Sequence, residues 1–364
     1  MSRERVNDRP NSRGASAEND TRSNAPPGPP ALVSDLPGLG DPTIMAAWLY
    51  YHEGMTQAEV AEVLKVSRPS VANMLARARE AGIVQISVRP DFLATLTLSR
   101  QIRERFGLRE AIVVPVPALA DTIAVHRSLG KAGAAYLEST VQPDEILVTA
   151  WGATMLEVAL AMSHKPVPGV RIAQSLGGVS TADHFNPTRV ASLMGEKFDA
   201  RVYHLYVPCV VESREVHDIL MRDRGIQSAF EVARSANRAI IGIGKVASDA
   251  TIVRAGFLSV LQMEALSAKG AVGDIMGRFF DIDGEPVLSE INERIMALTF
   301  EDLQRIKPVI AVAGGPEKVD TILGAIRSGY IDVLIVDERT ANAVMELDRK
   351  TRAGASAATF REPR

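Results

Sequence analysis

The sequence predicts an α/β protein with two folded parts, a small N-terminal helix-turn-helix domain and a larger, doubly wound α/β domain. The first part is indicated by residues 56–82, which hold two short amphipathic segments separated by a three-residue turn. The second is indicated by the chain from about residue 110 onward, where short β-branched apolar runs alternate with helical stretches. A length of 364 residues accommodates both domains and two tails.

Composition excludes several classes of protein. With 46% apolar and 23% charged residues the chain is globular, and its net charge of -3 argues against indiscriminate coating of nucleic acid. The single cysteine, Cys209, cannot form an internal disulfide, lacks metal-ligand spacing and is expected to be buried. We therefore expect no metal and no cofactor. No apolar run approaches the ~20 residues that span a bilayer, and the N-terminus lacks a hydrophobic signal core, so we expect a cytoplasmic protein without a membrane partner.

Changes in composition set the expected domain boundaries. Residues 1–40 are rich in Pro, Ser, Asn, Gly and Arg without apolar periodicity, which predicts a disordered tail. A helix-turn-helix domain is expected over 41–90, a linker helix over 91–107 and an α/β domain over 108–350. Residues 351–364 resemble the first tail in composition and are expected to be disordered as well.

The first of the two short helices begins after Thr56. Thr56 followed three residues later by Glu59 is a capping box, which satisfies the first backbone donors of a helix. Val60, Ala61 and Leu64 then share one face of that helix. A preceding helix repeats apolar residues at the same spacing and would supply the third wall of a small core, through Ile44, Ala47, Trp48 and Tyr51.

The second short helix begins after Ser67, which can cap it, and Pro69 is tolerated in its first turn. Gly82 ends the helix. Its apolar stripe, at spacings of i, i+3, i+4 and i+7, consists of Val71, Met74, Leu75 and Ala78. Alternating apolar residues follow and predict a short half-buried strand, as in a winged-helix domain, at Val84, Ile86 and Val88.

The outward face of the second helix carries groups that suit the major groove of DNA. Asn73 can form two hydrogen bonds to adenine, and Arg77 or Arg68 can reach guanine or a phosphate. Gln57, near the start of the preceding helix, can contact the DNA backbone. The predicted DNA-binding residues are Thr56, Gln57, Ser67, Arg68, Ser70, Asn73 and Arg77.

The basic surface of this segment is local. Between Lys65 and Glu80 there are four basic residues and one acidic residue, but over 41–90 five basic residues balance five acidic ones. We therefore expect a homo-oligomer, a dimer or a tetramer, to share the binding of double-stranded DNA. An ordinary helical hairpin is the alternative. The capping box, the short turn, the outward Asn and Arg and the glycine stop together favour DNA binding.

The linker segment 91–107 is predicted to be helical. Leu98, Ile102 and Phe106 form an i, i+4, i+8 stripe, and Phe92 and Leu96 extend the apolar surface. Such a helix can pair with its copy in a dimer or pack against its own domain, and the sequence does not decide between these two arrangements.

Seven strands are predicted in the larger domain. They are short and apolar at consecutive positions, which favours a parallel sheet covered on both faces. The strands are expected at Ala111 to Val116, Glu145 to Thr149, Val170 to Ser175, Arg201 to Val207, Ala239 to Ile243, Pro308 to Val312 and Val333 to Asp337. Helical stretches between them include 121–139, 153–163, 316–327 and 338–347.

Four of the predicted strands run into glycine at their carboxyl ends, where ligands bind in such sheets. The turns contain Gly152, Gly178, Gly244 with Lys245 beside it, and Gly314 with Gly315. Bare glycines allow an anion to approach backbone amides, and Thr154 and Lys318 add a hydroxyl and a charge. This set suits a phosphate with attached hydroxyls. It is neither a P-loop nor a dinucleotide fingerprint.

Asp274 lies between glycines in a later segment, Gly273-Asp274-Ile275-Met276-Gly277. Its carboxylate can accept hydrogen bonds from sugar hydroxyls, whereas an exposed turn aspartate is the alternative.

Taken together, these motifs resemble the SorC-type transcriptional regulators of bacterial carbohydrate operons, which are sometimes grouped with the DeoR regulators. The resemblance runs from about residue 43 to 348. It rests on Thr56 to Ala61, Ser67 to Val71, Ala78 to Val84, Gly273 to Asp281, Ala313 to Lys318 and Asp337 to Ala341.

The resemblance implies a C-terminal sugar-binding domain similar to the phosphosugar isomerase and CoA-transferase fold. It also implies an operator-bound oligomer, commonly a tetramer and a repressor, that is controlled by a sugar, polyol or sugar phosphate. The expected effector-binding residues are Gly152, Thr154, Gly178, Lys245, Asp274, Gly314, Gly315 and Lys318.

Two positions depart from the family pattern. The family usually has glycine where this chain has Lys65, and a lysine held at positive φ would cost on the order of 1 kcal/mol. Recognition helices of the family often carry Ser-Arg where this one has Ala72-Asn73, so an operator sequence cannot be carried over from relatives.

Two other functions are compatible with parts of the sequence. A sugar-phosphate isomerase or deaminase could use Lys245, Asp274 and Lys318 for acid-base work. However, the spacing shows no nucleophile beside a base and no paired histidine and carboxylate, so no catalytic residue is assigned. A scaffold that uses the N-terminal helices only for oligomerisation is the second alternative, and it would lack salt-sensitive DNA binding.

Overall fold

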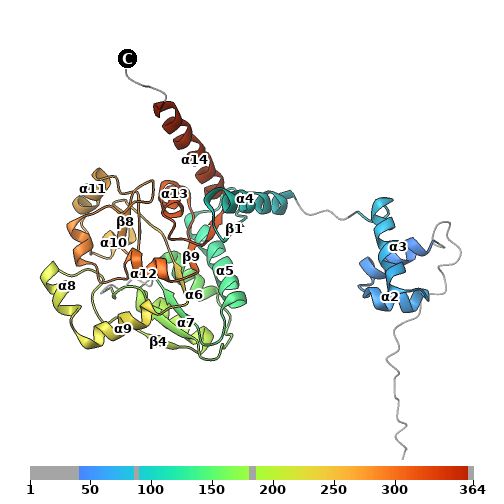
Figure 1. The fold of residues 1–364 in the computed structure, drawn as a ribbon, viewed down its shortest axis with the longest axis horizontal. Helices are drawn as coiled ribbons and strands as arrows, with labels where there is room; N and C mark the ends of the chain where they lie inside the picture. Colours follow the sequence, from blue (N-terminus) through green and yellow to red (C-terminus); the bar gives the residue numbers. More distant parts are fainter. Residues whose placement is uncertain (1–40, 86–89, 180–185, 360–364) are drawn as a thin grey trace, which may run out of the picture. The chain divides into compact units, whose positions relative to one another are not determined.

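The computed structural model describes residues 41–85, 90–179 and 186–359. The chain divides into two compact units, Met1–Ser87 and Val88–Arg364 (Figure 1). Both predicted tails have parts outside the described residues, namely 1–40 and 360–364. Among the described residues, no helix is both long enough and apolar enough to cross a membrane.

The smaller unit is helical. Its elements are α1 (Pro42–Ala47), a π-helical turn η1 (Trp48–His52), α2 (Gln57–Leu64) and α3 (Arg68–Glu80). One apolar core joins them, with Ala46, Ala47, Leu49, Val60, Ala61, Val71, Leu75 and Ala78 buried. The predicted core is therefore confirmed, with Trp48, Leu64 and Met74 partly buried against it, except at Ile44 and Tyr51. Val84, the first residue of the predicted wing strand, lies in a bend after α3. The other two residues of that strand, Ile86 and Val88, lie outside the described residues.

Tyr51 was expected in this core, and that prediction is wrong. Its side chain is 41% exposed, and Leu49 is buried instead. The cause is the π-helical turn over Trp48–His52, which bonds each residue to the fifth one before it and so rotates the following side chains away from the 3.6-residue pattern.

In the larger unit helices and strands alternate. Its first half holds α4 (Pro90–Phe106), β1 (Glu110–Val114), α5 (Thr122–Thr140), β2 (Ile146–Thr149), α6 (Ala153–Ala161), β3 (Arg171–Gln174), α7 (Pro187–Phe198), β4 (Arg201–Tyr203), α8 (Arg214–Leu220), α9 (Arg224–Arg234) and β5 (Arg238–Ile241). Its second half holds β6 (Gly244–Lys245), α10 (Thr251–Arg254), α11 (Val260–Ala268), β7 (Gly273–Ile275), β8 (Arg278–Phe280), η2 (Glu290–Arg294), α12 (Phe300–Arg305), β9 (Val309–Val312), η3 (Pro316–Lys318), α13 (Val319–Arg327), β10 (Val333–Asp337) and α14 (Glu338–Thr359).

Seven of these strands form one parallel sheet in the order β1-β10-β9-β5-β2-β3-β4. They correspond to the seven predicted strands, so the doubly wound α/β prediction is confirmed. From β2 the chain proceeds outward to β3 and β4, then returns to β5 on the other side of β2 and continues to β9 and β10. The topological switch point therefore lies between β2 and β5, where α/β sheets open a crevice for ligands.

Helices cover both faces of this sheet (Figure 1). On one face α5, α6 and α7 bury side chains such as Leu129, Met155 and Met194 against the sheet. On the other face α4, α9, α13 and α14 contribute to a second core, which includes Ile102 and Phe230. Because successive strand residues point to opposite faces, a strand buried on both faces is apolar at every position.

A second, three-stranded antiparallel sheet in the order β6-β7-β8 was not predicted. Its strands have two or three residues and contain Gly244, Gly273 and Asp274, which are typical of turns. Such short segments have no detectable period, so the sequence indicated turns instead. This small sheet brings β6, which follows β5, beside Asp274.

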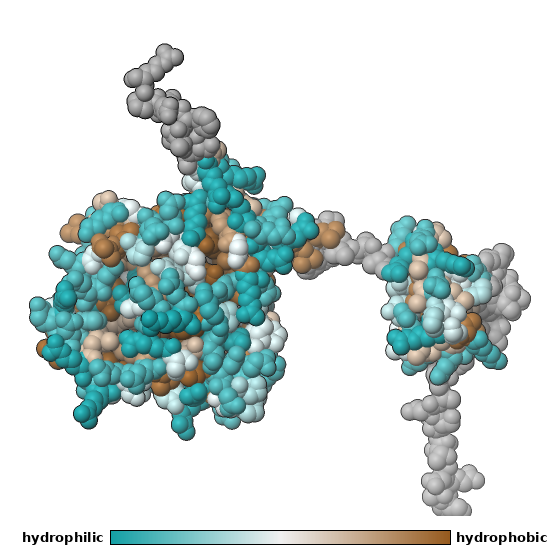
Figure 2. Space-filling model, in the orientation of Figure 1, coloured by the Kyte–Doolittle hydropathy of each residue, from teal (hydrophilic) through white to brown (hydrophobic). Residues whose placement is uncertain are grey.

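The linker helix α4 packs against its own unit. Leu98 and Ile102 are buried in the core, and Phe106 packs against it. Near the start of α4, Leu93 and Leu96 are 49% and 64% exposed, and apolar surface gathers over that part of the helix (Figure 2). The stripe from Leu98 to Phe106 therefore packs within its own unit. Leu96, which was predicted to extend the apolar surface, is exposed, and the side chain of Phe92 lies outside the described part of the chain.

The last helix is longer than predicted. The expected helix ended at residue 347 and a tail began at 351, but α14 extends to Thr359 and projects from the body of the unit (Figure 1). Ion pairs from Asp348 to Arg327 and Arg352 and from Lys350 to Glu346 stabilise its middle turns. Residues 351–359 have no apolar periodicity, which led to the tail prediction, but they include four alanines, the residue that most favours a helix.

Candidate effector cavity and nucleic-acid interface

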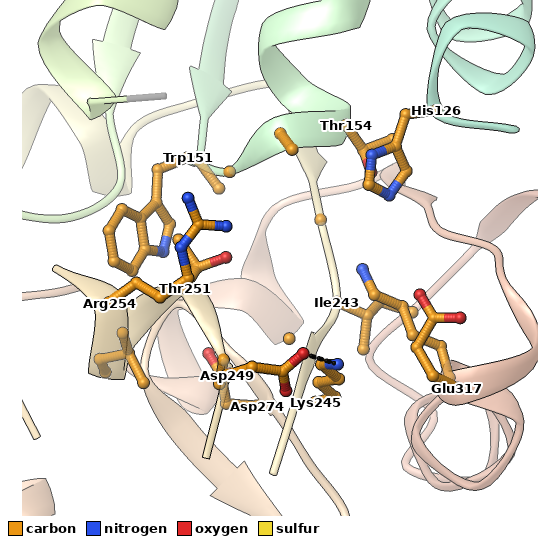
Figure 3. A pocket seen from close by; sticks show the side chains of 18 of the residues that line it. His126, Trp151, Thr154, Ile243, Lys245, Asp249, Thr251, Arg254, Asp274 and Glu317 are labelled. Carbon is orange, nitrogen blue, oxygen red and sulfur yellow. Dashed lines mark hydrogen bonds and ion pairs between the residues drawn. The ribbon is translucent and has the colours of Figure 1, made fainter. Parts of the chain in front are cut away.

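A cavity of about 210 Å³ lies at the switch point, beside the carboxyl ends of β2 and β5 (Figure 3). Segments far apart in the sequence form its wall: the start of α5, the β2–α6 turn, the β5–β6 segment, α10, the β7–β8 turn and η3. It is the place where the sheet topology predicts a ligand. Five of the eight expected effector-binding residues line it, namely Gly152, Thr154, Lys245, Asp274 and Lys318.

Lys318 is a cavity lysine without a bonded partner among the described residues. Within the described part of the chain its ammonium group forms no hydrogen bond and no ion pair. Burial lowers the pKa of Lys318, the charge of Lys245 adds to this effect, and Glu317 and Asp274 act in the opposite direction. The side chain of Lys318 is partly buried, and a partly buried lysine without a bonded counter-ion is a group that an anion would stabilise.

Lys245 has a partner. Its ammonium group lies 2.8 Å from Oδ2 of Asp249, and both residues line the cavity (Figure 3). This pair is therefore locally neutral, so Lys245 has to exchange Asp249 for a ligand before it can bind an anion.

Asp274 lies in β7 and is 7% exposed, so the alternative of an exposed turn aspartate is wrong. Its Oδ2 accepts a 2.8 Å hydrogen bond from the backbone amide of Gly277. Burial raises the pKa of Asp274 to about 6, although the Gly277 hydrogen bond and the charge of Lys318 oppose the shift. Gly244 pairs with Asp274 across the two strands, and a Cβ there would lie 1.9 Å from the aspartate Oδ1. Glycine at 244 is thus required for the carboxyl group to occupy this position.

The first turn of α6 also faces the cavity. Its N-cap is Gly152, with φ of +111°, and no side chain caps the helix. Thr154 lies in this turn and is 5% exposed. The first amides of a helix have no intrahelical acceptor, and the helix dipole is positive at this end. This turn therefore offers both N–H donors and a hydroxyl to a ligand.

The other three expected residues lie outside the cavity. The Gly178 amide donates to the carbonyl of Val207 at 2.8 Å. The Gly315 amide donates to Oδ2 of Asp337 and to the Thr340 hydroxyl at 2.9 and 2.8 Å. A Cβ at Gly314 would lie 2.3 Å from the same Asp337 oxygen. Glycine at 314 thus allows close packing within the protein, and the amides of Gly178 and Gly315 already have acceptors.

Several cavity residues were not predicted. They are an aromatic residue, a hydroxyl, two charged residues and a histidine: Trp151, Thr251, Arg254, Glu317 and His126 (Figure 3). Trp151 was visible in the sequence because it directly precedes Gly152. The histidine had no local signal, since it lies on α5, before β2, and reaches the cavity only through the fold.

In the smaller unit the predicted DNA-binding face is accessible. Ser67, Arg68, Asn73 and Arg77 are exposed, as is Thr56, while Gln57 and Ser70 are partly exposed. The predicted capping box is confirmed: the amide and hydroxyl of Thr56 both donate to Glu59 Oε2 at 2.8 Å. Ser67 caps α3, and its hydroxyl lies 2.8 Å from that of Ser70.

The turn between α2 and α3 depends on Lys65. Its backbone adopts φ of +54° and ψ of +42°, so this lysine takes the left-handed conformation that usually selects glycine. The turn therefore has the conformation that a glycine would adopt at this position without strain. Cys209 is buried as predicted, and burial raises the pKa of its thiol to about 12.

Comparisons with known proteins identify both parts of the chain. Residues 91–346 match the Sugar-bind family of sugar-binding domains, and residues 48–81 match the Sigma-70 region 4 family. The chain is 34% identical over 309 residues to the uncharacterized transcriptional regulator YjhU of Escherichia coli K12, covering 84% of this chain and 94% of that protein. It is 36% identical over 304 residues to the deoxyribonucleoside regulator of Bacillus subtilis 168, covering 83% and 96%.

A solved structure gives the same result. The full-length sorbitol operon regulator SorC from Klebsiella pneumoniae superposes with a TM-score of 0.66 at 25% identity, covering 83% of this chain and 97% of that one. These relatives are transcriptional regulators, which decides against the isomerase or deaminase hypothesis and against a mere scaffold. The chain belongs to the SorC/DeoR-type family of transcriptional regulators with a sugar-binding domain.

Proposed function

We propose that this regulator binds operator DNA through α3, and that a small sugar phosphate, sugar or polyol bound in the switch-point cavity weakens that binding. The observation that carries the effector part is Lys318, a cation without a bonded partner in the described residues, at the same cavity as the uncapped first turn of α6. Repression, relieved by the effector, is the mode that the family resemblance favours.

The chemistry of the cavity supports a ligand with both an anionic and a hydroxylated part. Lys318 and the α6 amides suit the anion. Asp274 can accept hydrogen bonds from hydroxyl groups, and Thr154 and Thr251 can donate or accept. Trp151 offers an apolar surface to carbon atoms, as sugar-binding sites need. A neutral polyol would use only the second set, so phosphorylated ligands should bind more tightly.

The DNA part rests on the exposed polar face of α3. Asn73 and Arg77 lie one helical turn apart and are exposed, so one helix can present both to the major groove. The charge balance of the smaller unit argues that one copy binds weakly. We propose that a dimer or tetramer binds the operator and that the protein acts in the cytoplasm, where a bacterial operator is found.

A thermal-shift screen of sugars, polyols and their phosphates tests the effector part. A ligand at a hundred times its Kd should stabilise the native state by about 2.7 kcal/mol. Lys318→Gln should remove the shift caused by a phosphorylated ligand. The matched control is Lys269→Gln, which changes an exposed lysine outside the cavity and should leave the shift intact.

A gel shift with DNA from upstream of the regulator's own operon tests the link between the two sites. The ligand that raises the melting temperature should lower the fraction of DNA bound, and Lys318→Gln should bind DNA but fail to respond. If no compound stabilises the wild type more than it stabilises Lys318→Gln, the cavity is not the effector site.

A further inference from the structure

His126 is a cavity residue with an unused polar atom. It lies on α5, and its ring faces the cavity on the side of Thr154 and Glu317 (Figure 3). Nε2 of this ring is buried, and no group of the described protein forms a hydrogen bond with it. A buried polar atom without a partner is costly, so a ligand atom that bonds to it gains more than it would at an exposed histidine.

The charges around His126 come mainly from η3. Burial lowers the pKa of His126, the positive charge of Lys318 lowers it further, and Glu317 acts in the opposite direction. Further ionisable groups lie on or beside α5: Asp121, Glu157 and Asp337. Others line the cavity: Asp274, Lys245, Asp249 and Arg254. The imidazole is therefore held neutral beside a cation, an arrangement that an added negative charge would reverse.

We infer that His126 forms an anion site together with Lys318 and the first turn of α6, and that its imidazole takes up a proton when a dianionic group binds there. The inference rests on the proposed effector function and refines it. A dianion offsets the repulsion between Lys318 and an imidazolium, and the protonated ring supplies N–H donors from both nitrogens.

The consequence is a choice of ligand class. Proton uptake at His126 strengthens binding only for a ligand with two negative charges on one group, such as the phosphate monoester of a small polyhydroxylated compound. A neutral polyol gains nothing from it. His126 would thus be a specificity-determining residue that distinguishes phosphorylated from unphosphorylated effectors, and effector affinity would fall as pH rises.

Inorganic sulfate is the suitable probe, because it stays dianionic across neutral pH whereas phosphate itself titrates. Sulfate affinity of the full chain can be measured from the rise in melting temperature with sulfate concentration, at several pH values between 6 and 8. Sulfate also stabilises proteins without a specific site. Lys318→Gln should lack the site, so the rise in its melting temperature with sulfate is subtracted from that of the other proteins at each pH.

For the wild type we expect site-specific sulfate affinity to fall with rising pH, approaching about tenfold per pH unit where one proton is taken up. His126→Gln should remove this one-proton dependence and weaken binding at pH 6, and His126→Asn serves as a second variant if the first folds poorly. His164→Gln, which changes an exposed histidine outside the cavity, should behave as the wild type. Asp274→Asn should retain the part of the pH dependence that comes from His126, so this variant distinguishes the titration of His126 from that of Asp274.

The outcomes are distinct. Loss of the pH dependence in His126→Gln but not in His164→Gln supports the inference. Site-specific sulfate binding with an unchanged pH dependence in His126→Gln overturns it and leaves the proposed anion site intact. Equal sulfate shifts in the wild type and Lys318→Gln at every pH overturn both.

Discussion

Arg105 on α4 and the buried Asp348 on α14 form a partly buried ion pair in which two guanidinium nitrogens contact one carboxylate oxygen. Nε and Nη2 of Arg105 lie 2.7 and 2.6 Å from Oδ2 of Asp348. The other oxygen, Oδ1, accepts a 2.8 Å hydrogen bond from Arg327 at the end of α13. One carboxylate therefore joins the linker helix to two C-terminal helices. Because α13 begins directly after Lys318 of η3 and ends at Arg327, it connects the cavity residue to this cluster.

Asp348→Asn should destabilise the larger unit by about 3 kcal/mol, because it leaves two arginines without their shared counter-charge. Urea unfolding followed by Trp151 fluorescence, in a Trp48→Phe background, reports on this unit alone, since the chain has two tryptophans. Arg352→Gln is the matched control. That arginine is 57% exposed and lies 3.4 Å from the same carboxylate, so its loss should change stability little. Equal losses from the two variants would argue against the buried pair.

The same carboxylate gives a pH prediction. Burial tends to raise the pKa of Asp348, but the hydrogen bonds from Arg327 and Arg105 outweigh burial and lower it below the ordinary value of 3.8. A folded pKa below the unfolded one means that the stabilisation is fully present above pH 3.8 and is lost as pH falls through the folded pKa. The stability difference between the wild type and Asp348→Asn should therefore be constant above pH 5 and should shrink below about pH 3.8.

Lys65→Gly should stabilise the helix-turn-helix unit by up to ~1 kcal/mol, because a lysine pays a steric cost at φ of +54° that glycine does not. The greater freedom of glycine in the unfolded chain offsets part of this gain. Lys65→Gln is the control, since it removes the charge and keeps the strained backbone. Unfolding followed by Trp48 fluorescence in a Trp151→Phe background measures both. A stability gain in the glutamine variant would point to charge instead of conformation.

The sheet could be predicted from the sequence because its physical signal is local. The inner strands β2, β5, β9 and β10 are buried along their whole length and show apolar runs, whereas the edge strands β1 and β4 are only partly buried. The capping box at Thr56 and Glu59 is local in the same sense. Tyr51 was misplaced because the π-helical turn that displaces it leaves no mark in residue spacing.

The cavity could be predicted only in part, for the opposite reason. Gly152 and Thr154 stand at a strand end, and strand ends meet at one edge of a parallel sheet, so their meeting with Lys318 follows from the fold class. The position of Asp274 depends on pairing with Gly244 in a sheet too short to leave a pattern. Gly315 does lie at a strand end, as predicted, but its amide donates to Asp337 and not to a ligand. No sequence pattern distinguishes a glycine that binds a ligand from one that bonds within the protein.

Asp274→Asn should stabilise the protein at neutral pH while it weakens effector binding. The folded pKa of about 6 lies above the ordinary value of 3.8, so folding disfavours the ionised carboxylate relative to the unfolded chain. Asp274 is therefore a source of instability that is fully present above pH 6 and is relieved as pH falls toward 3.8. The difference of roughly two units corresponds to about 3 kcal/mol.

Urea unfolding of wild type and Asp274→Asn at pH 8 and pH 4 tests this. The asparagine variant should be the more stable one at pH 8, and the two should converge at pH 4. In Asp274→Asn the side-chain oxygen can still accept the hydrogen bond from the Gly277 amide, so this bond should not mask the effect. A stability difference that is the same at both pH values would show that the carboxyl group is not desolvated as described.

The face of α3 can be tested by separating specificity from affinity. Asn73→Ala should lose about 1 to 3 kcal/mol of discrimination at one base pair of the operator, because a bidentate contact to a base edge reads sequence. Arg68→Ala should instead weaken binding to all sequences alike and reduce the salt dependence by about one released counterion per copy. Arg79→Ala is the control. This exposed arginine lies two residues beyond Arg77, on the opposite side of α3 from Asn73 and Arg77 and about three turns from Arg68.

Affinities for the operator and for single-base variants, measured by fluorescence anisotropy at several salt concentrations, distinguish these effects. Asn73→Ala should keep the salt slope of the wild type and bind several sequences equally well at the affected position. Arg68→Ala should keep the sequence preference and lose part of the slope. Because specificity and slope are independent measurements, unchanged operator discrimination in Asn73→Ala would assign sequence recognition to another face, even if α3 contacts DNA.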